Sequence, residues 1–153
     1  MNWPTARPSH QEWQGKVFTK KDLESVCGLG AVDGLKGANC YHEYYPFIPG
    51  VSKRQYTGEQ LKEMNAAENV PKEYMGNQYT KYEATQEQRN MERLMRKQRQ
   101  DIDLLKKGGA DDKTIRAARA RYRNTMHRYS DFSKKMGLPQ EKERIYIDGL
   151  GRV

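Results

Sequence analysis

The chain has 153 residues, of which 35% are hydrophobic and 31% are charged, and its net charge is +8. A folded chain of this length buries about 70% of its unfolded surface, so a real core is expected although the composition is polar. Membrane spans need apolar runs of about 20 residues, and the chain has none; nor does a signal-peptide core follow Met1. We therefore expect a soluble protein of the cytoplasm, or of a particle assembled there.

The excess positive charge lies in one segment. Residues 84–136 contain 15 Lys or Arg and 7 Asp or Glu, whereas the rest of the chain is balanced. This asymmetry favours an anionic partner such as nucleic acid, but it is equally typical of a solvated face on long helices. The residues that we would test first for phosphate binding are Arg93, Arg96, Arg119 and Arg123.

The first 50 residues are rich in Gly, Pro and aromatic side chains, which indicates turns rather than long helices. Residues 16–19 are predicted to form a short strand. Residues 20–27 are predicted to form a short helix, because Thr19 stands at its cap and Gly28 ends it.

Three features are predicted between residues 46 and 82. Residues 46–50 contain two prolines, which favour a rigid extended arm. Residues 57–67 are expected to form a helix that begins with a capping box of Thr57 and Gln60. The following connector is rich in Tyr, and a turn at residues 76–77 allows a pair of strands.

The second half of the chain has the periodicity of two long helices. Residues 83–107 end at two glycines, and a second helix begins at about residue 111 and ends at Gly137. Spacings of three, four and seven residues place the apolar side chains of each helix on one face. The stripes are Met91, Leu94, Met95, Ile102 and Leu105, then Ile115, Ala118, Tyr122, Met126, Tyr129 and Met136.

The C-terminal tail is predicted to hold a short strand at residues 145–147. The sequence thus indicates an α+β fold. We expect a turn-rich N-terminal unit with short strands and an extended arm (1–82), a basic antiparallel helical hairpin (83–138) and a tail (139–153), within a single compact domain.

Three blocks of the chain, at residues 7–18, 37–50 and 79–86, carry a resemblance to a known family. Their sequences are RPSHQEWQGKVF, GANCYHEYYPFIPG and YTKYEATQ. Together they resemble the phage minor capsid protein 2 family, a branch of the Mu F-like head-morphogenesis proteins, in its C-terminal part. The resemblance implies a role in the virion, as a low-copy head component that assists assembly near the portal, with portal and capsid proteins as partners.

The family's proteins usually carry a long region before the first block, whereas here Met1 lies six residues upstream of Arg7. The chain is then either an excised piece or a natural short copy. A natural short copy leaves a second hypothesis open, in which a phage or mobile-element effector inhibits a host defence nucleoprotein such as a CRISPR nuclease.

The resemblance also implies a metal site. In the wider head-morphogenesis group, the first block often holds a Cys-x-x-Cys pair and the later block ends in Asn-Cys-Arg-Cys. Aligned residue by residue, Arg7 and His10 occupy the first pair, and Cys40 and His42 the second. Arginine cannot bind zinc, so the predicted Zn²⁺ ligands are His10, Cys40 and His42, with Cys27 as a fourth. The alternative is that zinc has been lost and that both histidines hydrogen-bond backbone.

A third hypothesis is a small metal-independent nuclease. His10 would act as general acid or base on a phosphodiester, with Arg7 and Lys16 on the developing charge. The sequence shows no second histidine or carboxylate that clearly pairs with His10, and it therefore favours a protein that is not an enzyme. Among the aromatic residues, Tyr44, Tyr45 and Phe47 are predicted to contact a protein partner.

Overall fold

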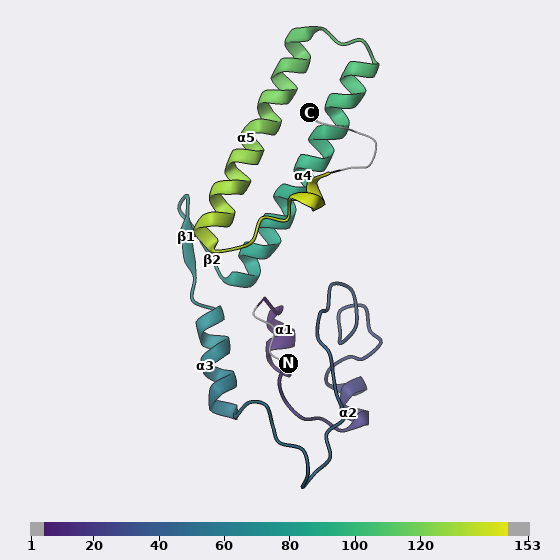
Figure 1. Ribbon diagram of the computed structural model, residues 1–153, viewed down its shortest axis with the longest axis vertical. Helices are drawn as coiled ribbons and strands as arrows, with labels where there is room; N and C mark the ends of the chain where they lie inside the picture. The colour runs from purple at the N-terminus through teal and green to yellow at the C-terminus, as the bar shows by residue number, and fades with distance from the viewer. Residues whose placement is uncertain (1–4, 147–153) are drawn as a thin grey trace. The chain divides into compact units, whose positions relative to one another are not determined.

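The computed structural model describes residues 5–146, and residues 1–4 and 147–153 lie outside this description. The predicted α+β class is confirmed, with helix in the majority (Figure 1). The elements are α1 (Pro8–Gln11), α2 (Lys20–Ser25), α3 (Gly58–Glu68), β1 (Lys72–Tyr74), β2 (Asn77–Tyr79), α4 (Lys81–Lys107), α5 (Asp112–Met136) and the 3-10 helix η1 (Lys142–Ile145).

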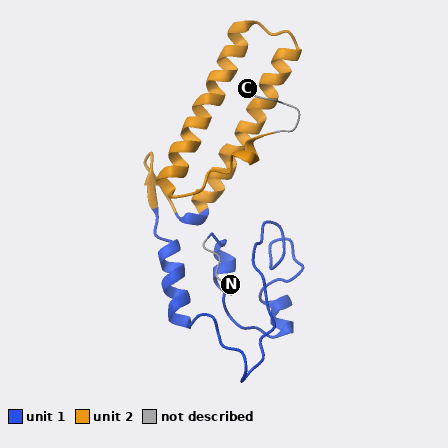
Figure 2. Ribbon diagram, in the orientation of Figure 1, with its two compact units in different colours: residues 1–71, 80–82 blue, residues 72–79, 83–153 orange. Residues whose placement is uncertain are grey.

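The chain divides into two compact units (Figure 2). Unit 1 comprises Met1–Pro71 and Thr80–Tyr82, and unit 2 comprises Lys72–Tyr79 and Glu83–Val153. Unit 1 contains the short helices α1 to α3, and unit 2 contains the two strands, most of α4, and α5. None of the described helices combines the length and the apolar character that crossing a bilayer requires.

The short helices of unit 1 begin at local capping signals. Thr19 accepts a hydrogen bond from the Asp22 N–H at 3.2 Å, and the Asp22 carboxylate accepts one from the Thr19 N–H at 3.3 Å. Thr57 and Gln60 exchange the equivalent bonds, at 3.2 and 2.8 Å, at the start of α3. Both predicted capping boxes are confirmed, because each depends only on residues three apart.

The core of unit 1 is small and lies beside a tightly folded glycine-rich loop. Trp13, Cys27 and Leu35 are its buried apolar side chains. Gly34 passes so close to Gly28 that a Cβ on Gly34 would lie 2.0 Å from the Gly28 carbonyl oxygen. Glycine is therefore required there, since no other side chain leaves room for this approach of two backbones.

The strand predicted at residues 16–19 is wrong. These residues have no regular structure, and in the described chain the sheet consists of β1 and β2 alone. A strand needs a hydrogen-bonding neighbour, and none lies beside this segment. Phe18 packs instead on the small core. The segment at residues 41–48 is likewise irregular and is followed by a turn.

In unit 2, β1 and β2 form an antiparallel hairpin, so the predicted strand pair is confirmed. Its turn lies at Met75 and Gly76, one residue before the predicted position at residues 76–77, because Asn77 already pairs with Tyr74. Lys72 pairs with Tyr79 at its open end. The rings of Tyr74 and Tyr79 meet the ring of Phe132 edge-on, with centroids 5.1 and 5.2 Å apart. The hairpin is therefore packed on α5 through aromatic contacts.

The two long helices run side by side and are joined by a short loop (Figure 1). Asp111 caps α5 by accepting a hydrogen bond from the Thr114 N–H at 3.0 Å, and Gly137 ends it in the left-handed conformation, at φ 69°. The helical hairpin is thus confirmed. Its core consists of Ala84, Met91, Met95, Tyr129, Phe132, Met136, Leu138 and Ile145.

The predicted stripes and this core differ at several positions, of which Leu94 and Phe132 are two. Leu94 was expected inside, but it is 44% exposed. Phe132 was not in the predicted stripe, yet it is fully buried, because the β-hairpin covers the face of α5 on which it lies.

Buried polar groups join the segment after α5 to the helices. The Gln88 amide donates to Ser133 Oγ at 2.9 Å and to the Pro139 carbonyl at 2.8 Å. The Tyr129 hydroxyl donates to Glu92 at 3.2 Å and accepts from the Glu141 N–H at 2.8 Å. Burial raises the pKa of the Glu92 carboxyl, and burial followed by the Glu92 charge raises the pKa of Tyr129 to about 12.

The strand expected at residues 145–147 is not seen in the described chain. Ile145 ends η1 instead and is buried in the core of unit 2, which makes the helical turn more favourable than an exposed strand. Tyr146 lies under the Arg99 guanidinium, with Cζ 5.1 Å from the ring centroid. Ile147 lies outside the described residues.

Candidate functional site

Three of the four predicted metal ligands converge in unit 1. His10 lies on α1, and Cys40 and His42 follow the glycine-rich loop. Their nearest ligand atoms all lie within 4.8 Å of one another. Both histidines are buried and Cys40 is half-buried. The structure therefore brings together two segments that are 30 residues apart in the sequence.

The loop is fixed to α1 by His10 and Arg7. His10 Nε2 lies 2.8 Å from the Asp33 carbonyl oxygen, and because this oxygen only accepts, the ring nitrogen donates. The Arg7 guanidinium donates to the same oxygen at 3.3 Å and to the Ala38 carbonyl at 2.8 Å. Arg7 stands where the wider family group often has a cysteine, and here it links the two segments through hydrogen bonds.

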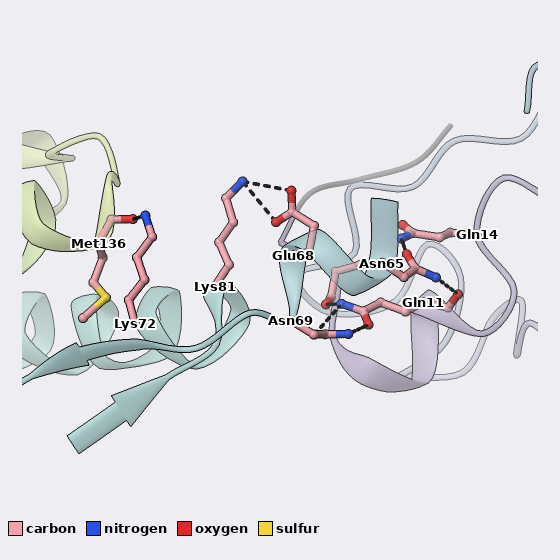
Figure 3. A network of polar contacts seen from close by, with 9 residues as sticks. Gln11, Gln14, Asn65, Glu68, Asn69, Lys72, Lys81 and Met136 are labelled. Atoms are coloured by element: carbon pink, nitrogen blue, oxygen red, sulfur yellow. Dashed lines mark hydrogen bonds and ion pairs between the residues drawn. The ribbon is translucent and has the colours of Figure 1, made fainter. Parts of the chain in front are cut away.

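His42 is oriented by a chain of amides. Its Nε2 donates to Gln14 Oε1 at 2.9 Å, and the Gln14 amide nitrogen donates to Asn65 Oδ1 at 3.1 Å. Asn65 in turn donates to the Gln11 carbonyl at 3.1 Å (Figure 3). Helix α3 thus sets the direction of Gln14, which sets the protonated nitrogen of His42. The sequence pattern gave no sign of Gln14 or Asn65.

In both rings the nitrogen that remains for a metal is Nδ1. His42 Nδ1 lies 3.6 Å from Cys40 Sγ. A histidine that donates one N–H to a carbonyl and directs the other nitrogen at a shared point is the arrangement found around bound metals. The zinc-free alternative expected both histidines to bond backbone groups. His10 does so at the Asp33 carbonyl, whereas His42 bonds the Gln14 side chain.

The buried surroundings of His10 and His42 favour the neutral form of both imidazole rings. Burial is the main cause that lowers the pKa of His10, and burial followed by the nearby His10 ring lowers the pKa of His42 to about 4. Trp13 covers both rings, with centroids 4.5 Å from His10 and 4.9 Å from His42. A neutral imidazole is the form that binds metal, so the two histidines need no deprotonation at pH 7.

The distances come close to a tetrahedral site. Zinc bond lengths place neighbouring ligand atoms about 3.3–3.8 Å apart, and the Cys40–His42 pair fits this range. The widest distance between two ligand atoms of the group, which lies within 4.8 Å, must contract by about 1 Å to fit this range. Cys27 is not part of the group. It lies buried in the apolar core of unit 1, and burial raises the pKa of its thiol.

The residues proposed for catalysis are only partly brought together. Arg7 and His10 share the Asp33 carbonyl oxygen as partner. Lys16 is exposed, and within residues 5–146 no hydrogen bond or ion pair joins it to the other two. The contacts of Arg7 and His10 are those of a structural clamp.

The predicted phosphate-binding residues occupy different environments. Arg93 is exposed and hydrogen-bonds Asn90, whereas Arg96 donates to the Arg144 carbonyl at 3.0 Å. Arg119 is half-buried, and Arg123 is exposed. Sequence reasoning missed Arg116, which is exposed and lies three and seven residues before Arg119 and Arg123, so that the three share one face of α5.

The predicted protein-contact residues differ in exposure. Tyr44 is 49% exposed and Tyr45 is 69% exposed, whereas Phe47 is half-buried. Together with other residues of unit 1 they line a hollow that is described below.

In a comparison with known protein families, the model of phage minor capsid protein 2 matches residues 2–134. The chain belongs to the phage minor capsid protein 2 family. It is thus a phage structural protein associated with the virion, as the resemblance of the three blocks implied. The comparisons with curated proteins and with solved structures give no match.

Proposed function

We propose that unit 1 is a zinc-stabilised module of a phage head protein, with His10, Cys40 and His42 as the Zn²⁺ ligands. The observation that carries the proposal is the convergence of these three donors, with both Nε2 atoms already donating to oxygen atoms. Two imidazoles and a thiolate are ligands that zinc prefers, and a water molecule completes four-coordination.

The metal's role in this proposal is structural. The apolar core of unit 1 is small, and residues 26–57 contain no regular elements. A zinc ion would join α1 to the end of the glycine-rich loop, and its binding free energy would add to the stability of the unit. The buried position of both histidines, beneath Trp13, supports this role over a reactive site that is open to substrate.

Elemental analysis tests the proposal directly. We expect one zinc ion per chain in protein purified without chelators. The Cys40→Ser variant should lose it, because the hydroxyl is a poor ligand. Cys27→Ala is the matched control and should retain the metal, since Cys27 lies outside the ligand group. Zinc-free wild-type protein that is nevertheless folded would end the proposal.

For unit 2 we propose binding to the phosphate backbone of DNA through α5. This helix contains eight Lys or Arg and two Asp or Glu. Arg116, Arg119 and Arg123 form a stripe on one face, and no acidic residue lies between them in the sequence. Such contacts do not depend on base sequence and weaken with salt.

We further propose that unit 1 contacts other head proteins through Tyr44 and Tyr45, whose exposure supports such a surface. An effector that inhibits a host defence complex could use the same surfaces. Gene neighbourhood distinguishes the two, because a head component is expected beside portal and capsid genes, whereas an effector is expected in a lone small gene.

A further inference from the structure

Unit 1 contains a hollow of about 690 Å³, and Tyr44 and Tyr45 of the proposed protein-contact surface belong to its lining. This volume lies in the range of sites that bind small molecules or single peptide segments. Apolar side chains line it from four stretches of the unit: Trp13, Phe18, Leu23, Cys27, Leu35 and Phe47. The hollow thus offers a place for an apolar side chain within the described part of unit 1.

The charged residues around this hollow are mostly positive. Lys16 lies before α2 and Lys20 is the first residue of α2, whereas Lys53 and Arg54 come from the segment before α3. Within residues 5–146 no ion pair or hydrogen bond involves these four side chains. The acidic residue of the lining, Glu43, is already paired with Lys36. A ligand with several negative charges would supply the missing partners.

We propose that this hollow binds an acidic, extended peptide segment of a partner protein, with an apolar side chain in the hollow and carboxylates on the four cations. The inference rests on the proposed contact with other head proteins and names the chemistry of the partner. The backbone of residues 43–47 makes no hydrogen bond among the described residues, so its donors and acceptors are available to a peptide main chain.

The lining favours a peptide over a nucleotide. Sites for nucleotide phosphates usually use glycine-rich backbone amides as donors. Here the glycine-rich stretch at residues 28–37 contributes only Leu35 to the lining. The cations come instead from flexible side chains on two separate segments, which suits carboxylates spaced along an extended chain.

Fluorescence anisotropy with a labelled peptide of alternating Glu and Leu tests the proposal, using the full chain. We expect saturable binding that is lost when Gln replaces every Glu in the peptide. The double variant Lys53→Gln/Arg54→Gln should bind about tenfold more weakly, because it removes two of the four cations that would pair with the peptide carboxylates. The control double variant Lys62→Gln/Lys113→Gln removes the same charge outside the hollow and should bind like wild type.

Equal binding by the two double variants, or equal binding of the Gln peptide, would overturn the proposal. A competition experiment gives a further contradicting outcome. It uses the Arg116→Gln/Arg123→Gln variant, which lacks two of the proposed DNA contacts on α5. If single-stranded oligo-dT displaces the Glu peptide from this variant, the hollow binds nucleic acid and the proposal is overturned. Zinc content and DNA affinity are measured on the same preparations. Failure of peptide binding with both intact would therefore reject this inference alone.

Discussion

The two units of the molecule are stabilised in different ways. In unit 2, Met95, Tyr129 and Phe132 are fully buried between regular elements. In unit 1 the buried apolar residues are few, and polar groups form many of the long-range contacts. Arg7 and His10 hold the loop, and Asn65 of α3 donates to the Gln11 carbonyl of α1. Unit 2 can therefore derive its stability from its own apolar core, whereas unit 1 depends on polar clamps, to which we propose that a metal ion is added.

Metal removal should produce the largest difference in behaviour between the two units. Trp13 belongs to the core of unit 1, whereas most helical residues belong to unit 2. Structural zinc is worth about 10 kcal/mol or more, so chelation should shift the tryptophan emission to longer wavelength. The helical circular dichroism signal should largely remain. Unchanged emission after the zinc has left would show that unit 1 does not need it.

The core of unit 2 should respond to a loss of apolar volume. Replacing Phe132 with Ala removes a fully buried ring that also supports Tyr74 and Tyr79, and should cost about 3–5 kcal/mol. Urea unfolding followed by circular dichroism measures this loss. The control is Leu94→Ala on the exposed side of α4, with an expected cost below about 1 kcal/mol. If Phe132→Ala and Leu94→Ala lower the free energy of unfolding by similar amounts, Phe132 is not a residue of the core.

The loop of unit 1 should respond to added volume. In Gly34→Ala the new Cβ would meet the Gly28 carbonyl oxygen, which requires a backbone shift and should cost about 3 kcal/mol. Thermal unfolding followed by tryptophan emission reports the change. Gly58→Ala, at the start of α3 with nothing within 4 Å, should be neutral or slightly stabilising.

Alkaline pH should weaken unit 2. The folded-state pKa of Tyr129 is raised to about 12, above the value of about 10 in the unfolded chain, so its contribution is present below pH 10 and is lost as pH rises toward 12. The loss should reach about 2 kcal/mol. The Tyr129→Phe variant should lack this pH dependence. If both proteins lose stability equally between pH 9 and 12, Tyr129 is not the cause.

The smallest expected effect concerns DNA. Arg123→Gln should weaken binding to duplex DNA a few-fold and reduce the slope of log K against log salt by about one. Arg128→Gln is the matched control on the same helix. Its guanidinium is 2.8 Å from Glu87 and is already paired, so its loss should matter less. The α5 assignment fails if the two variants weaken binding equally.

The features that depend on nearby residues could be predicted from the sequence. The capping boxes at Thr19 and Thr57 involve residues three apart, and Gly137 marks the end of α5 by its own conformational freedom. Residues 145–147 were judged by β propensity alone. The burial of Ile145 against the helices, which favours η1, depends on contacts that this propensity does not contain.

The candidate ligands of the site could be predicted from the sequence, but the residues that hydrogen-bond and orient them could not. His10, Cys40 and His42 were found through the resemblance of two blocks, and the structure brings them together. The chain from His42 through Gln14 to Asn65 joins amides 51 residues apart, and amides carry no periodic signal. Cys27 was offered as a ligand on residue type alone, whereas the fold places it in the apolar core.

Titration of metal-free protein with Co²⁺ tests the central claim most directly, because the visible spectrum of cobalt reports its geometry and its thiolate ligands. We predict intense tetrahedral bands with a thiolate charge-transfer band, an endpoint of one Co²⁺ per chain, and loss of the charge-transfer band in Cys40→Ser. A weak spectrum like that of aqueous Co²⁺, unchanged by this substitution, would contradict the metal centre.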